Sequence, residues 1–168
     1  NSYHDNEFMT EELYNFWFNQ EVKYLLHLSN KKYIPEILII DTKKRIIEFK
    51  WYDKNLNVMI ENNTINKVKD WQKKIKAIKD DLEKDNIFKI NMYPHTFFFD
   101  DDDNAYIMDL YGCTDKQTRY LDTKYLKPLI RTNRFDKFII NDQLDTHELY
   151  NETIKTNYAE WPGDFLNA

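Results

Sequence analysis

The sequence IFKINMYPHTFFFDDDDNAYIMD, residues 87–109, decides the fold. Its two apolar runs, 97–99 and 105–108, flank the polar stretch 100–104. Strand-forming residues on both sides of a short turn-forming loop predict an antiparallel hairpin. Asp109 ends the second strand of this hairpin.

The residues before this hairpin predict two helices and another hairpin. Apolar residues recur at helical spacing over 10–28, and Thr10 is suited to cap that helix. Runs 36–41 and 45–52 are rich in strand-forming residues and predict an antiparallel hairpin around a Thr-Lys-Lys turn. A second, amphipathic helix is predicted from a cap at residues 62–64 to Leu82.

After the hairpin the signals are weaker. Residues 120–130 predict a short helix interrupted by Pro128, and 135–140 fit either a strand or a buried helical turn. Residues 146–158 predict a helix, which a Trp-Pro-Gly stretch ends. No repeat, low-complexity tract or linker divides residues 1–168, so we expect one α+β domain.

Composition excludes several classes of protein. The 168 residues include only two glycines, Gly112 and Gly163, so no glycine-rich phosphate loop can be drawn on the chain. Lys and Arg number 24 against 29 Asp and Glu, for a net charge of −5. Few of the cations are arginine, the side chain best shaped to grip phosphates and bases. We therefore expect no nucleic-acid partner.

The sequence carries no membrane signal. Apolar runs are only a few residues long, and the N-terminal region has no basic stretch followed by an apolar one. We therefore expect neither a membrane-spanning helix nor a signal peptide. Cys113 is the only cysteine, which excludes an internal disulfide and fits the cytoplasm. The chain begins with Asn1 and not with methionine, so an extension before it stays open.

The order of the elements and the motif around Pro94 resemble the middle of a protein-kinase-like domain, including its aminoglycoside- and choline-kinase relatives. Glu21 lies on the apolar side of the first helix, like the inward glutamate of the kinase helix. Residues 49–52 resemble the hinge between the kinase lobes. The stretch 87–109 is similar to the catalytic loop and metal loop in length and hydrophobic rhythm. The resemblance covers residues 17–112.

When the proline of the kinase catalytic loop is aligned with Pro94, the family's catalytic and metal-binding positions can be read on this sequence. The catalytic aspartate falls on Asn91, the metal-binding asparagine on Thr96 and the metal-loop aspartate on Asp109. The resemblance thus implies a degenerate catalytic position at Asn91, metal ligands at Asp109 and Thr96, and a cofactor-side role for Glu21. A neutral amide is a poor proton acceptor, and threonine is a weaker metal ligand than asparagine. The glycine-rich lid and its lysine strand are missing before the Glu21 helix.

The resemblance implies a reduced kinase-like fold, with a small antiparallel sheet and a helical lobe. Residues 1–52 would form a partial small lobe and residues 53–168 a reduced large lobe. Because the catalytic groups and the lid are altered, we expect a non-catalytic binding or regulatory protein. The alternatives are a divergent phosphotransferase that uses ATP and magnesium, and a pure interaction or structural protein on the same scaffold.

The chain also resembles small uncharacterised kinase-like proteins of marine bacteriophages. A bacteriophage origin would place it in the cytoplasm of the host.

The resemblance leaves two candidate partners, another protein and a second copy of the chain.

Each site residue also has a structural interpretation. Asp109 suits a magnesium or phosphate ligand, but also a carboxylate that caps backbone amides. Glu21, without its usual lysine partner, suits a solvated or locally paired glutamate. The run 100–103 lacks the glycine and the closing glutamate of a calcium loop, so we expect an exposed turn. Cys113 is expected to be a buried, unreactive thiol. No spacing among the four histidines suits a metal site.

Overall fold

Helices and short antiparallel strands alternate in the computed structural model, which describes residues 9–90, 92–115, 118–129 and 136–157. This arrangement confirms the α+β class. The helices are α1 (Glu11–His27), α2 (Leu56–Glu61), α3 (Trp71–Lys84), α4 (Thr123–Leu126) and α5 (Thr146–Asn157). The strands are β1 (Ile37–Asp41), β2 (Ile46–Phe49), β3 (Lys54–Asn55), β4 (Phe88–Lys89), β5 (Phe97–Phe99), β6 (Ala105–Ile107), β7 (Cys113–Thr114), β8 (Tyr120–Asp122), β9 (Ile139–Ile140) and β10 (Gln143–Asp145).

The predicted first helix and first hairpin are confirmed as α1 and as β1 paired with β2. The Thr10 hydroxyl caps α1 by accepting the Leu13 N–H at 3.3 Å, and two glutamates in the first turn suit the positive end of the helix dipole. Asp41 closes the hairpin turn by accepting the N–H groups of Lys43 and Lys44. Arg45, at the end of that turn, contacts Glu11 and so ties the hairpin to α1.

The prediction of one long second helix from residues 62–64 is wrong. Helix α2 ends at Glu61, a 3-10 turn follows at Ile65–Lys67, and α3 begins only at Trp71. Asn63 and Asp70 both have positive φ, 56° and 55°, and each interrupts the helical path. Ile65 and Val68, whose spacing suggested the helix, are therefore buried, but they lie in and just after the 3-10 turn and not in an α-helix.

The predicted hairpin at 97–109 is confirmed. Strand β5 pairs with β6 in the register Phe97↔Ile107 and Phe98↔Tyr106, and β3 joins the other edge of β5. Asp100 accepts the N–H groups of Asp102 and Asn104, which closes the acidic turn, and most of that turn is exposed. The acidic run is therefore an exposed hairpin turn, as predicted.

The C-terminal part differs from expectation at one point. Tyr120–Asp122 is a strand and not the start of a helix, because β10, which was not predicted, pairs with it. The short helix α4 follows, and Pro128 lies in the 3-10 turn after it. Residues 136–140 contain both alternatives, a 3-10 turn and then β9. Helix α5 is confirmed through Asn157, whereas Tyr158, Phe135 and the Trp-Pro-Gly stretch lie outside the described residues.

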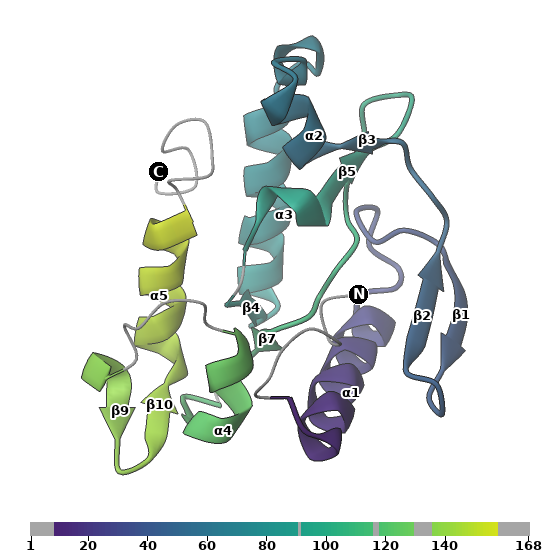
Figure 1. Cartoon of the computed structure of the whole chain (residues 1–168). Helices are drawn as coiled ribbons and strands as arrows, with labels where there is room; N and C mark the ends of the chain where they lie inside the picture. Colours follow the sequence, from purple (N-terminus) through teal and green to yellow (C-terminus); the bar gives the residue numbers. More distant parts are fainter. Residues whose placement is uncertain (1–8, 91, 116–117, 130–135, 158–168) are drawn as a thin grey trace.

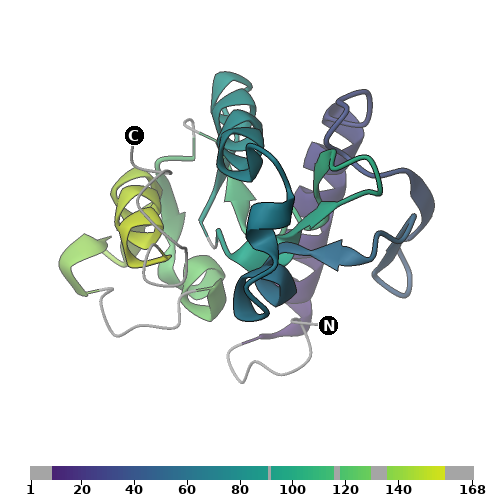
Figure 2. The same cartoon turned by 90° about the horizontal axis from the view of Figure 1, so that it is seen from above.

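Two large hydrophobic clusters and one small one form the core of the described residues. The first joins the C-terminal half of α1 to α3 and to the β5–β6 hairpin, and the second contains Trp17 of α1 with side chains of α4, β10 and α5. The small cluster pairs Phe88 of β4 with Tyr150 of α5. Figures 1 and 2 show the β1–β2 hairpin at one end of the molecule and α5 with β9 and β10 at the other. Helix α1 therefore contributes to both large clusters.

Tight turns in this chain use very little glycine. Of the described residues with positive φ, only Gly112 is glycine, at 81°. Apart from Arg45, the others are asparagine or aspartate, whose short polar side chains tolerate the left-handed conformation: Asn63, Asp70, Asn86, Asp103, Asn141 and Asp142. Scarcity of glycine therefore excludes phosphate loops without excluding turns.

Among the described residues, no helix has the length and apolar character needed to cross a bilayer.

Candidate functional site

The site predicted around Asp109 lies in the loop between β6 and β7, residues 109–112, which we call the Asp109 loop. Just before it, the Met108 N–H donates to the Thr96 carbonyl at 2.8 Å and anchors the loop to the start of β5. Within it, the Asp109 Oδ1 atom accepts the Tyr111 N–H at 2.6 Å. At its end, the Gly112 carbonyl accepts the Ile90 N–H at 3.0 Å. The loop therefore has a defined backbone path.

Two buried charged side chains brace this loop from the protein interior. Glu21, on α1, is 7% exposed and accepts the Leu110 N–H at 3.1 Å. Lys89, on β4, has a fully buried side chain and donates to the Tyr111 carbonyl at 2.6 Å. Burial of a charge is costly unless hydrogen bonds or an opposite charge compensate for it. Both side chains are compensated by hydrogen bonds, Glu21 at Leu110 and Lys89 at the next residue, Tyr111.

The Asp109 carboxylate is held at the surface end of this arrangement. Its side chain is 32% exposed, and the Lys89 Nζ atom lies 3.9 Å from its Oδ1 atom. Within the described part of the chain, both polar contacts of Asp109 are made by Oδ1. Asp109 thus caps a backbone amide with one oxygen and leaves Oδ2 for a ligand. Its role as a metal ligand stays a prediction.

The other predicted site residues lie close to the loop or outside the described residues. Glu21 is buried and not solvated, and it accepts the N–H of Leu110, far along the sequence. Thr96 is buried, and its hydroxyl donates to the Tyr93 carbonyl at 2.8 Å, which closes the 3-10 turn before β5. The structure therefore gives both side chains a bracing contact, and their ligand roles stay predictions. Asn91 lies outside the described residues.

Asp109 stands apart from any cluster of metal-binding side chains among the described residues. In the ranges that the structure describes, no group of three histidine, cysteine or acidic side chains is arranged to hold an ion. Magnesium is commonly held by one or two carboxylates together with substrate phosphates and water. The Asp109 carboxylate suits that kind of shared site better than a metal site built from protein ligands alone.

A group of aromatic side chains on the β5–β6 hairpin was not predicted. Phe98 and Tyr106 lie directly opposite each other in the β5–β6 hairpin, so their side chains share one face of it, on which Phe98 is buried and Tyr106 is half-buried. Trp51 packs edge-on against Phe98 at 5.9 Å between ring centroids, and Tyr52 stacks on Tyr106 at 4.3 Å. Trp51 is 70% exposed. These four residues are called the aromatic face below.

Lys89 was also missed, although the sequence carries a signal for it. It is the charged residue in the apolar run 87–90, and such a position in a buried strand indicates a specific partner. Tyr111 and Asp109, however, lie 22 and 20 residues further along the chain and are found only when β4 pairs with β7. The aromatic face likewise depends on the pairing of Phe98 with Tyr106.

Cys113, directly after the Asp109 loop, is expected to be unreactive in the native protein. Burial raises the pKa of its thiol to about 12, the Lys89 ammonium partly opposes this, and the charges of Asp109 and Glu21 add to it. We expect Ellman's reagent at pH 8 to label the native thiol at least ~1000-fold more slowly than the protein unfolded in guanidinium chloride, because only the accessible thiolate reacts. Rapid native labelling would contradict the burial of Cys113.

No protein-family model matches the chain, and no curated protein matches its sequence at a significant level.

Proposed function

We propose that the chain is a kinase-like, non-catalytic binding or regulatory protein, and that its ligand is a magnesium–nucleotide complex held at Asp109. The observation that carries the proposal is the bracing of the Asp109 loop by Glu21 and Lys89. Two buried charges that fix one short loop preorganise the carboxylate at its start. Such preorganisation is expected of a binding site and exceeds what a capped turn requires.

The aromatic face supports a nucleotide as the ligand. Tyr106 lies three residues before Asp109 on the same strand and loop, so a base on the aromatic face and phosphates at Asp109 can belong to one molecule. Flat bases stack on exposed aromatic rings, and Trp51 has the exposed area for this. Binding of the base would also shield the Trp51 indole from water.

The expectation of binding without transfer rests on charge. Asn91 stands where the resemblance places the proton-accepting aspartate, and its amide has no negative charge. The Lys89 ammonium, the basic group nearest to Asp109 in the described residues, is fully buried and bonded to the Tyr111 carbonyl. It therefore serves the loop and does not reach a phosphate. ATP should be recovered unchanged after incubation with the protein.

Thermal unfolding with ATP and Mg²⁺ tests the proposal. At ten times its dissociation constant, a ligand adds about 1.4 kcal/mol to the unfolding free energy, which raises the Tm of a domain of this size by about 3–6 °C. We expect this shift in the wild type and its loss in Asp109→Asn. The asparagine keeps an acceptor for the Tyr111 N–H but removes the charge, so the loop should persist.

Asp122→Asn is the matched control. Asp122 also accepts an N–H two residues ahead, that of Lys124 at 3.1 Å, but it lies on β8, outside the site. The control should keep the full shift. Absence of any shift at millimolar ATP and Mg²⁺ would reject the nucleotide, and an equal shift in Asp109→Asn would reject Asp109 as its ligand. Formation of ADP would show that the protein is a phosphotransferase or an ATPase.

A further inference from the structure

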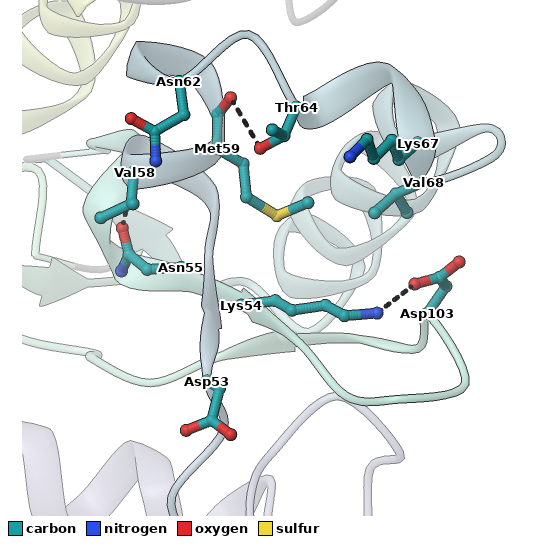
Figure 3. A pocket seen from close by; sticks show the side chains of 10 residues that line it. All are labelled: Asp53, Lys54, Asn55, Val58, Met59, Asn62, Thr64, Lys67, Val68 and Asp103. Atoms are coloured by element: carbon teal, nitrogen blue, oxygen red, sulfur yellow. Dashed lines mark hydrogen bonds and ion pairs between the residues drawn. The ribbon is translucent and has the colours of Figure 1, made fainter.

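A pocket lies where β3 and α2 face the segment before α3 (Figure 3). Its volume is about 310 Å³, near the lower limit of small-molecule sites. Its apolar lining comes from Val58 and Met59 of α2 and from Val68, which is almost fully buried. Val58 is 50% exposed, although it is an aliphatic residue on a helix. The pocket therefore has room for one apolar side chain.

The pocket is lined by two lysines and two aspartates, and one of these lysines, Lys67, belongs to a lysine-rich segment. Figure 3 shows the Lys67 side chain directed across the pocket towards Thr64 and Met59. Residues 65–76 contain five lysines and one aspartate, a net charge of +4 in a chain whose total is −5, and Lys67, Lys69 and Lys73 are exposed. Lys74 of this segment donates to the Asp103 carbonyl at the rim of the pocket. The segment is therefore a local basic surface that adjoins an apolar pocket.

The cations of the pocket differ in their partners. Lys54 forms an ion pair with Asp103 at 2.9 Å, so its charge is largely balanced. Lys67 is exposed and has no ion pair among the described residues. An incoming carboxylate would thus find at Lys67 a charge that no internal pair competes for. Such complementarity directs encounter and fixes orientation in protein complexes.

We propose that this pocket docks an acidic segment of a partner protein, which inserts one apolar side chain between Val58, Met59 and Val68. Carboxylates on either side of that side chain lie against Lys67 and the lysines that follow it. Methionine suits such a surface because its flexible thioether adapts to the shape of an incoming group. The docking site does not include the Asp109 loop, although its residue Asp53 accepts the indole N–H of Trp51 at 2.7 Å and so adjoins the aromatic face.

The charges of the opposite rim favour a peptide over a polyanion. Asp53, which is exposed, lines the pocket and would repel a nucleic-acid backbone or an anionic bilayer, whereas the charge of Asp103 is balanced by Lys54. A short peptide can direct its few carboxylates towards Lys67 and away from Asp53, which a continuous polyanion cannot do. The chain also offers few arginines, the residue type that grips phosphates best.

Fluorescence anisotropy with a defined probe tests the docking site. The probe is a fluorescein-labelled peptide, Glu-Glu-Leu-Glu-Glu, and the matched peptides replace its leucine by glycine or its glutamates by lysines. We expect saturable binding of the probe, binding at least about tenfold weaker without the leucine, and none with the lysines. Binding should weaken as salt rises, because exposed charges are screened.

Variants locate the binding on the protein. Lys67→Glu and Val58→Asp should each weaken the probe about tenfold or more, since one reverses the free charge and the other places a carboxylate in the apolar lining. Lys84→Glu is the control, because Lys84 is an exposed lysine at the other end of α3. Circular dichroism of each variant shows whether it is folded.

Several results would overturn the proposal. The first is that the probe shows no saturable binding at millimolar concentration. The second is that the glycine peptide binds as tightly as the probe. The third is that Lys84→Glu weakens binding of the probe as much as Lys67→Glu does. If a single-stranded DNA decamer or phosphatidylserine vesicles bind more tightly than the probe, and Lys67→Glu abolishes that binding, the pocket belongs to a different class of partner. Binding of the probe that survives in Asp109→Asn is expected and separates this site from the nucleotide site.

Discussion

Replacement of Trp17 by alanine should lower the free energy of unfolding by about 3–5 kcal/mol, the range for loss of a fully buried large aromatic side chain. The Trp17 side chain has no exposed surface, and its Nε1–H donates to the Tyr125 carbonyl at 2.7 Å. It also packs edge-on against Tyr111 of the Asp109 loop. One side chain of α1 thus supports both the C-terminal cluster and the loop. Urea unfolding followed by circular dichroism measures the loss.

Trp51→Ala is the matched control for this prediction. Trp51 is 70% exposed, and substitutions at exposed positions usually change stability by less than about 0.5 kcal/mol. Trp17→Phe provides an intermediate, because it keeps most of the ring volume and loses the hydrogen bond to Tyr125. Equal losses in Trp17→Ala and Trp51→Ala would contradict the packing described for α1.

Lys89→Met should cost about 3 kcal/mol of stability and also weaken the proposed nucleotide shift. Methionine keeps the length of the side chain, but the Tyr111 carbonyl loses its donor and Asp109 loses its nearby cation. A buried polar group without its partner costs about 1–3 kcal/mol, and breaking a buried charge pair costs more. Urea unfolding and thermal shift with ATP and Mg²⁺ report the two effects separately.

Lys79→Met is the control for Lys89→Met. Lys79 is also buried, at 9% exposed, but it pairs with Glu83 one helical turn away on α3. Pairs of this kind contribute only about 0.3–0.5 kcal/mol.

A double-mutant cycle with Glu21→Gln adds a second check. If both charges brace one loop, the double variant should cost less than the two single losses together, by about 0.5–3 kcal/mol. Strict additivity would separate the roles of Glu21 and Lys89.

The elements that were predicted correctly are those whose local pattern agrees with their final environment. Helix α1 has a cap and a continuous apolar stripe, and the strands β5 and β6 flank a turn that Asp100 closes by itself. Strand β10 was missed because its three residues carry no alternation of their own, and its pairing with β8 creates the strand. The second helix was extended too far because apolar spacing does not reveal a residue with positive φ, such as Asp70.

The candidate site was only partly accessible to sequence reasoning. Asp109 was found from its place after an apolar strand, and Glu21 from its place on an apolar helix face. Glu21 bonds to Leu110, the residue directly after Asp109, and this contact depends on tertiary packing. The spacing of apolar residues in the sequence does not reveal it. The same holds for Lys89 and for the pocket at Val58 and Met59, whose walls come from segments with no shared motif.

The left-handed turns of this chain have a consequence for the gene that encodes it. Every glycine codon begins with two guanines, whereas asparagine codons begin with two adenines. Asparagine occupies turn positions such as Asn63, Asn86 and Asn141, where glycine is the usual choice. Among the described turns only Gly112 keeps the guanine-rich codon. This fold is therefore compatible with a coding sequence poor in guanine and cytosine.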